Sequence, residues 1–281
     1  MLDSLQTVVF LATSNSEGPA IHITPAELFR IGEVSVSNSM FFGLISSALI
    51  LTVLINVAKR MTIRPKRGFV QFVEIGTEFI INTIQNSLGS RKKAIQYAPL
   101  FVSAFFFVMF SNWLGLIPGA GEAFTYNGQP VIRPFTADLN ATLAASTVMM
   151  VIVQYLAIRE SGLKKHIRHY FAGSLLNPAT YLLGVFEVFS ELTKILSLAL
   201  RLFLNVAIGE TILVIFMYLG SYAAPITALP ILLLELFVGA LQAYIFTMLT
   251  IMYLSASIKH DHDAEELERH ELAKKAAVQS A

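Results

Sequence analysis

The chain has 281 residues, of which 55% are hydrophobic and 14% charged, and its formal net charge is +1. Soluble domains carry fewer apolar residues and about 25% charged ones, so this composition indicates an integral membrane protein. The near-neutral balance excludes a nucleic-acid binder recognisable from its overall charge. The sequence contains no cysteine, which removes disulfides, thiol catalysis and cysteine-based metal sites together.

Residues 1–38 are mixed in composition and rich in turn residues, which indicates an N-terminal arm outside the membrane. They lack the basic start and the long apolar core of a cleavable signal peptide, so we expect none. The first long apolar run, Met40–Ala58, is long enough to cross a hydrocarbon layer about 30 Å thick. Basic residues cluster between Lys59 and Arg67, which predicts a cytoplasmic location for this end of the span.

Residues 69–90 mix phenylalanine and isoleucine with glutamate and glutamine, a pattern typical of an amphipathic helix on the membrane surface. Tyr97–Ile117 and Leu139–Ile158 are the second and third expected spans. The loop between these two spans is poor in basic residues, which predicts that it lies outside. The segment after Ile158 is strongly basic, which predicts a cytoplasmic loop.

Two very long helices are expected next, at 179–220 and 227–258, separated by a turn at Pro225. At about 1.5 Å per residue the first would be about 60 Å long, twice the hydrocarbon thickness. Neither a proline nor a polar loop interrupts it, so we expect a steeply tilted helical hairpin held by a large partner.

The predicted fold class is therefore an all-α integral membrane protein with about five crossings, a C-terminal hairpin of two long tilted helices and an amphipathic surface helix. The membrane domain would cover residues 39–258, with 179–258 as the hairpin. Residues 259–281 would form a charged cytoplasmic tail. The N-terminus is expected outside and the C-terminus in the cytoplasm.

Arg201 lies inside an almost uninterrupted apolar run, Ile195 to Gly220. An arginine at the centre of a membrane helix costs about 2.5–3.5 kcal/mol on insertion scales, and it does not lose its proton to avoid that cost. An acidic partner or a wet cavity must offset it. At about 100° per residue, the same line of this helix carries Glu187, Ser190, Lys194, Ser197, Asn205 and Ile208.

Such a polar stripe is expected to face protein or water, because lipid tails cannot form hydrogen bonds with its side chains. A stripe buried inside the helix bundle is the alternative. Glu210 follows Arg201 by nine residues, so it points to nearly the opposite side, about 13 Å away along the axis. The two therefore do not form a simple ion pair within the helix.

On the last helix, Glu235 and Gln242 share a face that an antiparallel hairpin would bring against the preceding helix. Carboxylates arranged in this way are typical of proton relays in membranes. The alternative is that Glu210 and Glu235 form a structural pair that shares hydrogen bonds or one proton.

Two runs, RLFLNVAIGE at Arg201–Glu210 and LQAYIFTMLT at Leu241–Thr250, resemble subunit a of F-type ATP synthases. The runs Asn112–Pro118 and Ala137–Leu143 are similar to motifs in the second and third membrane segments of that family. The resemblance covers about residues 37–258, and its motifs occur in the family's order.

The resemblance implies that Arg201 is the stator arginine facing the carboxylates of a rotating c-ring. It implies that Glu210 belongs to an outer half-channel for protons, and that Glu187 and Lys194 belong to an inner one. The other residues expected along the proton pathway are polar or acidic: Asn205, Gln242, Glu235, Asp138 and Asn140. Glu235 stands where many bacterial members carry histidine, and Leu204 stands where glycine is common.

The function implied is the proton-conducting stator subunit of ATP synthase, with two offset half-channels separated by the arginine. Expected partners are the c-subunit ring, the b-subunit peripheral stalk, the other ATP synthase subunits and the lipid bilayer, and no nucleic acid. The chain would be a non-catalytic part of an enzyme complex, with no cofactor or metal. The expected location is a bacterial plasma membrane.

The main alternative is a secondary transporter or ion channel that uses Arg201 as an anion site. Such proteins are typically built from internal repeats and broken helices, which this sequence lacks. A second alternative is an intramembrane hydrolase with Ser197 or Ser255 as nucleophile. It is weak because the predicted spans contain no histidine to act as a base.

Overall fold

The computed structural model describes residues 27–31, 34–60, 68–116, 125–126, 129–130, 133–162, 178–220 and 223–279. Most of the expected N-terminal arm and the basic segments at 61–67 and 163–177 lie outside these described residues. The predictions made for those segments therefore stay predictions.

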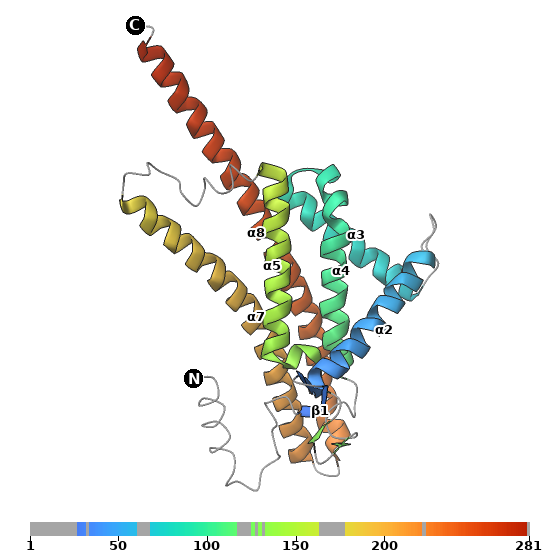
Figure 1. The fold of residues 1–281 in the computed structure, drawn as a ribbon. Helices are drawn as coiled ribbons and strands as arrows, with labels where there is room; N and C mark the ends of the chain where they lie inside the picture. Colours follow the sequence, from blue (N-terminus) through green and yellow to red (C-terminus); the bar gives the residue numbers. More distant parts are fainter. Residues whose placement is uncertain are drawn as a thin grey trace. The chain divides into compact units, whose positions relative to one another are not determined.

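Helices dominate the described chain (Figure 1). The long ones are α2 Asn38–Arg60, α3 Phe69–Leu88, α4 Arg91–Gly115, α5 Leu139–Ser161, α7 Pro178–Gly220 and α8 Ala224–Gln279. A three-residue 3-10 helix, η1 Phe135–Ala137, precedes α5. Two short antiparallel ladders complete the described elements: β1 Glu27–Ile31 with β2 Val34–Ser37, and β3 Thr125–Tyr126 with β4 Gln129–Pro130.

Five helices of the described residues are long and apolar enough to cross a membrane. They are Asn38–Lys59, Arg91–Gly115, Leu139–Glu160, Gly184–Gly220 and Ala224–Ile258. This confirms the predicted all-α membrane protein with about five crossings. Helix α3 is not among the five, as its mixed pattern predicted.

The two long C-terminal helices are present. Helix α7 has 43 residues and α8 has 56. Their apolar stretches, of 37 and 35 residues, exceed the roughly 20 residues that cross a bilayer upright. Thr227 closes the turn between them, since its Oγ1 donates to the carbonyl oxygens of Phe216 at 3.0 Å and Ala224 at 3.1 Å. A Cβ at Gly220 would collide with the Thr227 hydroxyl, so this close turn requires glycine there.

The chain divides into two compact units. The first is drawn from Met1–Val70, Ala104–Thr142 and Leu200–Tyr244, and the second from Gln71–Ser103, Leu143–Ala199 and Ile245–Ala281. Helices α4, α5, α7 and α8 each contribute a segment to both units.

The first unit contains an aromatic cluster on α4. Phe106 lies edge-on to Phe105, with ring centroids 5.1 Å apart, and stacks on Phe110 at 5.7 Å. Phe107 meets Phe135 of η1 at 6.0 Å. The contact between Phe107 and Phe135 holds η1, which leads into the start of α5, against α4.

The second unit is held by a separate apolar core and by polar links at helix ends. Ile80 and Ile84 of α3, Phe101 of α4 and Ile251 of α8 are fully buried. Ser255 of α8 donates from its hydroxyl to the carbonyl oxygen of Ser87 at 2.8 Å. Polar contacts therefore tie the end of α3 to α8.

Candidate functional site

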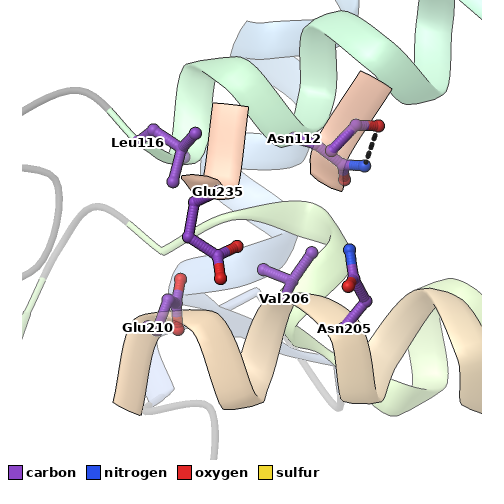
Figure 2. Close-up of a pocket in the computed structure, with 8 residues that line it drawn as sticks. Asn112, Leu116, Asn205, Val206, Glu210 and Glu235 are labelled. Carbon is purple, nitrogen blue, oxygen red and sulfur yellow. Dashed lines mark hydrogen bonds between the residues drawn. The ribbon is translucent and has the colours of Figure 1, made fainter. Parts of the chain in front are cut away.

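A small pocket in the first unit lies between α4, α7 and α8 (Figure 2). Its volume is about 10 Å³, about the room that one water molecule needs. The lining includes two carboxylates and two carboxamides, with small and apolar residues between them: Asn112, Gly115, Leu116, Asn205, Val206, Glu210, Glu235 and Gly239. Two acids therefore share one small hollow among mostly apolar helices.

The carboxyl groups of Glu210 and Glu235 point toward each other across this pocket (Figure 2). Gly209 allows the approach, because a Cβ at that position would collide with the Glu235 carboxyl group. The structure thus brings together the two acids that the antiparallel hairpin predicted. Asn205, which was also predicted for the proton pathway, lines the same pocket and lies more than one turn before Glu210 on α7.

Helix α4 holds α8 at the level of the pocket. Asn112 donates from Nδ2 to the carbonyl oxygen of Gly239 at 3.3 Å, and Trp113 donates from Nε1 to that of Leu236 at 3.0 Å. A Cβ on Gly239 would lie 3.2 Å from the Asn112 Cβ, so the two helices meet closely at this glycine. These contacts fix the segment of α8 that carries Glu235.

Two carboxamides of the first unit have buried polar atoms without hydrogen-bond partners among the described residues. They are Oδ1 of Asn112 and Nε2 of the predicted site residue Gln242. An unsatisfied buried polar atom costs about 1–3 kcal/mol. A water molecule bound to either atom would offset that cost. Asn112 lines the pocket, and Gln242 follows the lining residue Gly239 by one turn of α8.

Arg201 is partly buried on α7 and does not line the pocket. No ion pair among the described residues involves its guanidinium. Along the predicted stripe of α7 in the first unit, Ile208 is 54% exposed, whereas Asn205 lines the pocket. The stripe therefore does not lie wholly inside the bundle.

The predicted inner residues belong to the second unit. Lys194 pairs with Glu191, with Nζ 2.7 Å from Oε1, and its ammonium lies 5.5 Å from the centroid of the Tyr253 ring. Glu187 is partly exposed on the same helix. Lys194 is thus matched by an acid one turn earlier on the same helix.

Asp138 and Asn140 do not line the pocket. Asp138 caps the start of α5. Its Oδ1 accepts from the Asn140 backbone nitrogen at 2.9 Å, and its carbonyl oxygen accepts from the Thr142 backbone nitrogen at 3.0 Å. Its Oδ2 accepts from the Ser39 hydroxyl at 2.5 Å, which ties α5 to the first turn of α2. The structure therefore gives Asp138 a joining role, and Asn140 contributes its backbone rather than its exposed side chain.

Sequence reasoning did not single out four residues that shape this region: Asn112, Gly209, Gly239 and Arg133. Asn112 lay within a motif noted for its resemblance. Gly209 and Gly239 carried a weaker signal, since small residues next to acids in membrane helices favour close helix contact. Arg133 lies in a connecting segment, where periodicity gives no indication of its neighbours.

Comparison with known proteins adds independent support. The family model of the ATP synthase A chain matches residues 40–255, which include every residue lining the pocket. The chain belongs to this family. Membership favours the ATP synthase expectation over the transporter and hydrolase alternatives.

Relatives named ATP synthase subunit a match over most of the chain. The protein from Moorella thermoacetica is 31% identical over 241 residues, covering 86% of this chain and 99% of the relative. The protein from Sulfurihydrogenibium sp. is 34% identical over 219 residues, covering 75% and 95%. The protein from Anaeromyxobacter dehalogenans is 33% identical over 229 residues; this match covers 78% of the chain and only 57% of that longer relative.

Proposed function

We propose that this chain is the subunit of the ATP synthase membrane sector that conducts protons to and from a rotating c-ring. Family membership and five apolar helices support a multi-pass membrane protein that acts in proton transport and ATP synthesis with the other ATP synthase subunits. The observation that carries the finer proposal is the pocket shared by Glu210 and Glu235.

In this proposal the pocket is the deepest part of the outer half-channel. Two carboxylates that face each other in a hollow with room for about one water repel strongly when both are charged. The pair therefore holds a proton readily and passes it on. Asn112, Asn205 and Gln242 supply carboxamides along the route, and Asp138 with Asn140 supports the outer entrance by holding α2 and α5 together.

Arg201 acts as the fixed charge of the stator. A permanent cation on an open face of α7 stabilises each c-ring carboxylate as it arrives, and it drives that carboxylate to release its proton. The same charge repels protons and so prevents a direct path between the two half-channels. Glu187 and Lys194 belong to the inner half-channel.

The same proposal sets the surroundings of the chain. The N-terminus lies outside and the charged tail after Ile258 lies in the cytoplasm, as the basic loops predict. The c-ring contacts the open face of α7, and the b-subunit stalk contacts the membrane domain elsewhere. The complex occupies a bacterial plasma membrane.

Proton flux through the intact complex in lipid vesicles tests the proposal, with a pH-sensitive dye as the readout. Glu210→Gln should slow the flux at least about tenfold, and Glu210→Leu with Glu235→Leu should slow it further, because general acid–base groups contribute about 10²–10⁴-fold. Glu78→Gln is the matched control, since the Glu78 side chain is 54% exposed on α3. Wild-type flux in the double leucine variant would refute the half-channel.

A further inference from the structure

Arg133 is a buried cation that the proton pathway described above does not use. It is 6% exposed and lies in the first unit, directly before Pro134 and η1. Its Nη2 donates to the carbonyl oxygen of Ala137 at 3.1 Å. Because arginine keeps its proton at any ordinary pH, this is a permanent positive charge that must be balanced by nearby acids.

The segment that carries Arg133 packs on the wall of the acid pocket. Pro134 lies against Gly115, one of the lining residues, so closely that a Cβ there would be 2.5 Å from the proline Cγ. On the α2 side, a Cβ at Gly43 would be 3.1 Å from the Phe135 ring. The hydrogen bond from Ser39 to Asp138 fixes the far end of the segment. Arg133 is therefore held beside the pocket.

Two acids act on the Arg133 guanidinium. Burial lowers the pKa of Arg133, while the negative charges of Glu210 and Asp138 raise it again. Asp138 already accepts hydrogen bonds on both of its carboxylate oxygens, from the Ser39 hydroxyl and the Asn140 backbone. Glu210 is the acid of the two that lines the pocket.

The charges around the pocket are otherwise negative among the described residues. The lining residues of α4 are uncharged, α7 contributes Glu210, and α8 contributes Glu235. The adjoining segment contributes Asp138 and Arg133. Arg201 precedes Glu210 by nine residues of helix, about 13 Å along the axis. Glu210 therefore lies beside a second acid, Glu235, and Arg133 is the described cation whose charge acts on Glu210.

We propose that Arg133 is a positioning residue of the proton pathway, the fixed counter-charge that lets Glu210 ionise next to Glu235. When the pair gives up a proton to water in the pocket, the guanidinium balances the carboxylate that remains. A proton arriving from the outer side then restores the acid. This inference rests on the proposed function of the pocket.

Flux measured against outer pH tests it, in the intact ATP synthase complex reconstituted into lipid vesicles. Arg133→Gln should raise the pH of half-maximal flux by about one unit, because loss of an opposite charge lets Glu210 hold its proton to a higher pH. Arg133→Lys keeps the charge and should leave that midpoint near wild type. If Arg133→Gln does not assemble, Arg133→His replaces it. Imidazole is uncharged above about pH 7, so this variant also lacks the positive charge there and should raise the midpoint to above that pH.

A residue that only supports the fold would change the amount of assembled complex and leave the midpoint in place. An unchanged midpoint in the glutamine or histidine variant, or an equal shift in the lysine variant, would overturn the role of Arg133. Glu210→Gln is measured in parallel. If it slows the flux while the midpoint stays fixed in the Arg133 variants, only this inference fails; if it leaves the flux intact, the proposed function fails.

Discussion

The two units differ in how some of their acidic side chains are paired. In the second unit two acids have basic partners: Glu160 accepts from the Lys93 ammonium at 2.7 Å and from the Tyr97 hydroxyl, and Glu191 pairs with Lys194 at 2.7 Å. In the first unit two acids, Glu210 and Glu235, line one pocket together. Matched groups hold helices in place, whereas acids that face each other are suited to binding and releasing a proton.

This difference has an energetic meaning. A buried charge that loses its partner costs about 3–5 kcal/mol, so a protein keeps ionisable groups in a membrane mainly where they act. The pocket of the first unit and the partly buried Arg201, which forms no ion pair, meet that condition among the described residues. The Lys93–Glu160 pair of the second unit satisfies both of its charges, and stability is enough to explain it.

The largest effect is expected from removing the charge of Arg201. Arg201→Ala should abolish proton-driven ATP synthesis, because no fixed cation would then meet the c-ring carboxylates, while the complex stays assembled in the membrane. Arg201→Lys should not restore full activity, since lysine lacks the planar fork and can lose its proton when desolvated. ATP synthesis in membrane vesicles is the measurement, and a normal rate in the alanine variant would break the assignment.

Much of the fold could be predicted because each span is a long apolar run bounded by basic residues. The boundaries shifted where tertiary contacts decide them. Helix α4 begins at Arg91 rather than at Tyr97, since Arg91 reaches Glu78 at 2.9 Å and Lys93 reaches Glu160. Helix α8 begins at Ala224, before the predicted start, because Thr227 closes the turn. The short β ladders had no clear pattern in the sequence.

The site was predictable only in part. The meeting of Glu210 and Glu235 follows from helical spacing and an antiparallel hairpin, so the sequence could indicate it. Asn112 of α4 and Arg133 of a connecting segment also act on these acids or their pocket. The helical periodicity of α7 and α8 gives no information about residues that come from other segments. Asp138 was expected on the pathway, but it also links α5 to α2 through Ser39, which lies 99 residues away in the chain.

A medium effect is expected from crowding the acid pair. In Gly209→Ala the new Cβ would collide with the Glu235 carboxyl group, so this group must leave its present position facing Glu210. This carboxyl group is the far end of a flexible side chain and can shift at little cost to stability, so the complex should still assemble while proton flux falls severalfold. Shortening the acid in the double variant Gly209→Ala with Glu235→Asp should recover part of the flux.

Gly76→Ala is the control for the glycine change, because Gly76 lies on α3, which contributes no residue to the lining of the pocket. It should leave the flux unchanged. Equal loss in both alanine variants would mean that the effect is general to helices and not specific to the pocket.

The smallest effect is expected at the Lys93–Glu160 pair of the second unit. Tyr97→Phe removes the hydroxyl that donates to Glu160 and leaves the Lys93–Glu160 pair, whose side chains are 35% and 21% exposed, in place. One hydrogen bond to a charged group is worth about 1.5–3 kcal/mol at most, and partial exposure reduces that value. The variant should therefore lower the thermal unfolding midpoint of the purified complex slightly and leave the pH profile of proton flux unchanged. A shift of that profile would show that Glu160 also exchanges protons with the pathway, and the distinction between matched and facing acids would then fail.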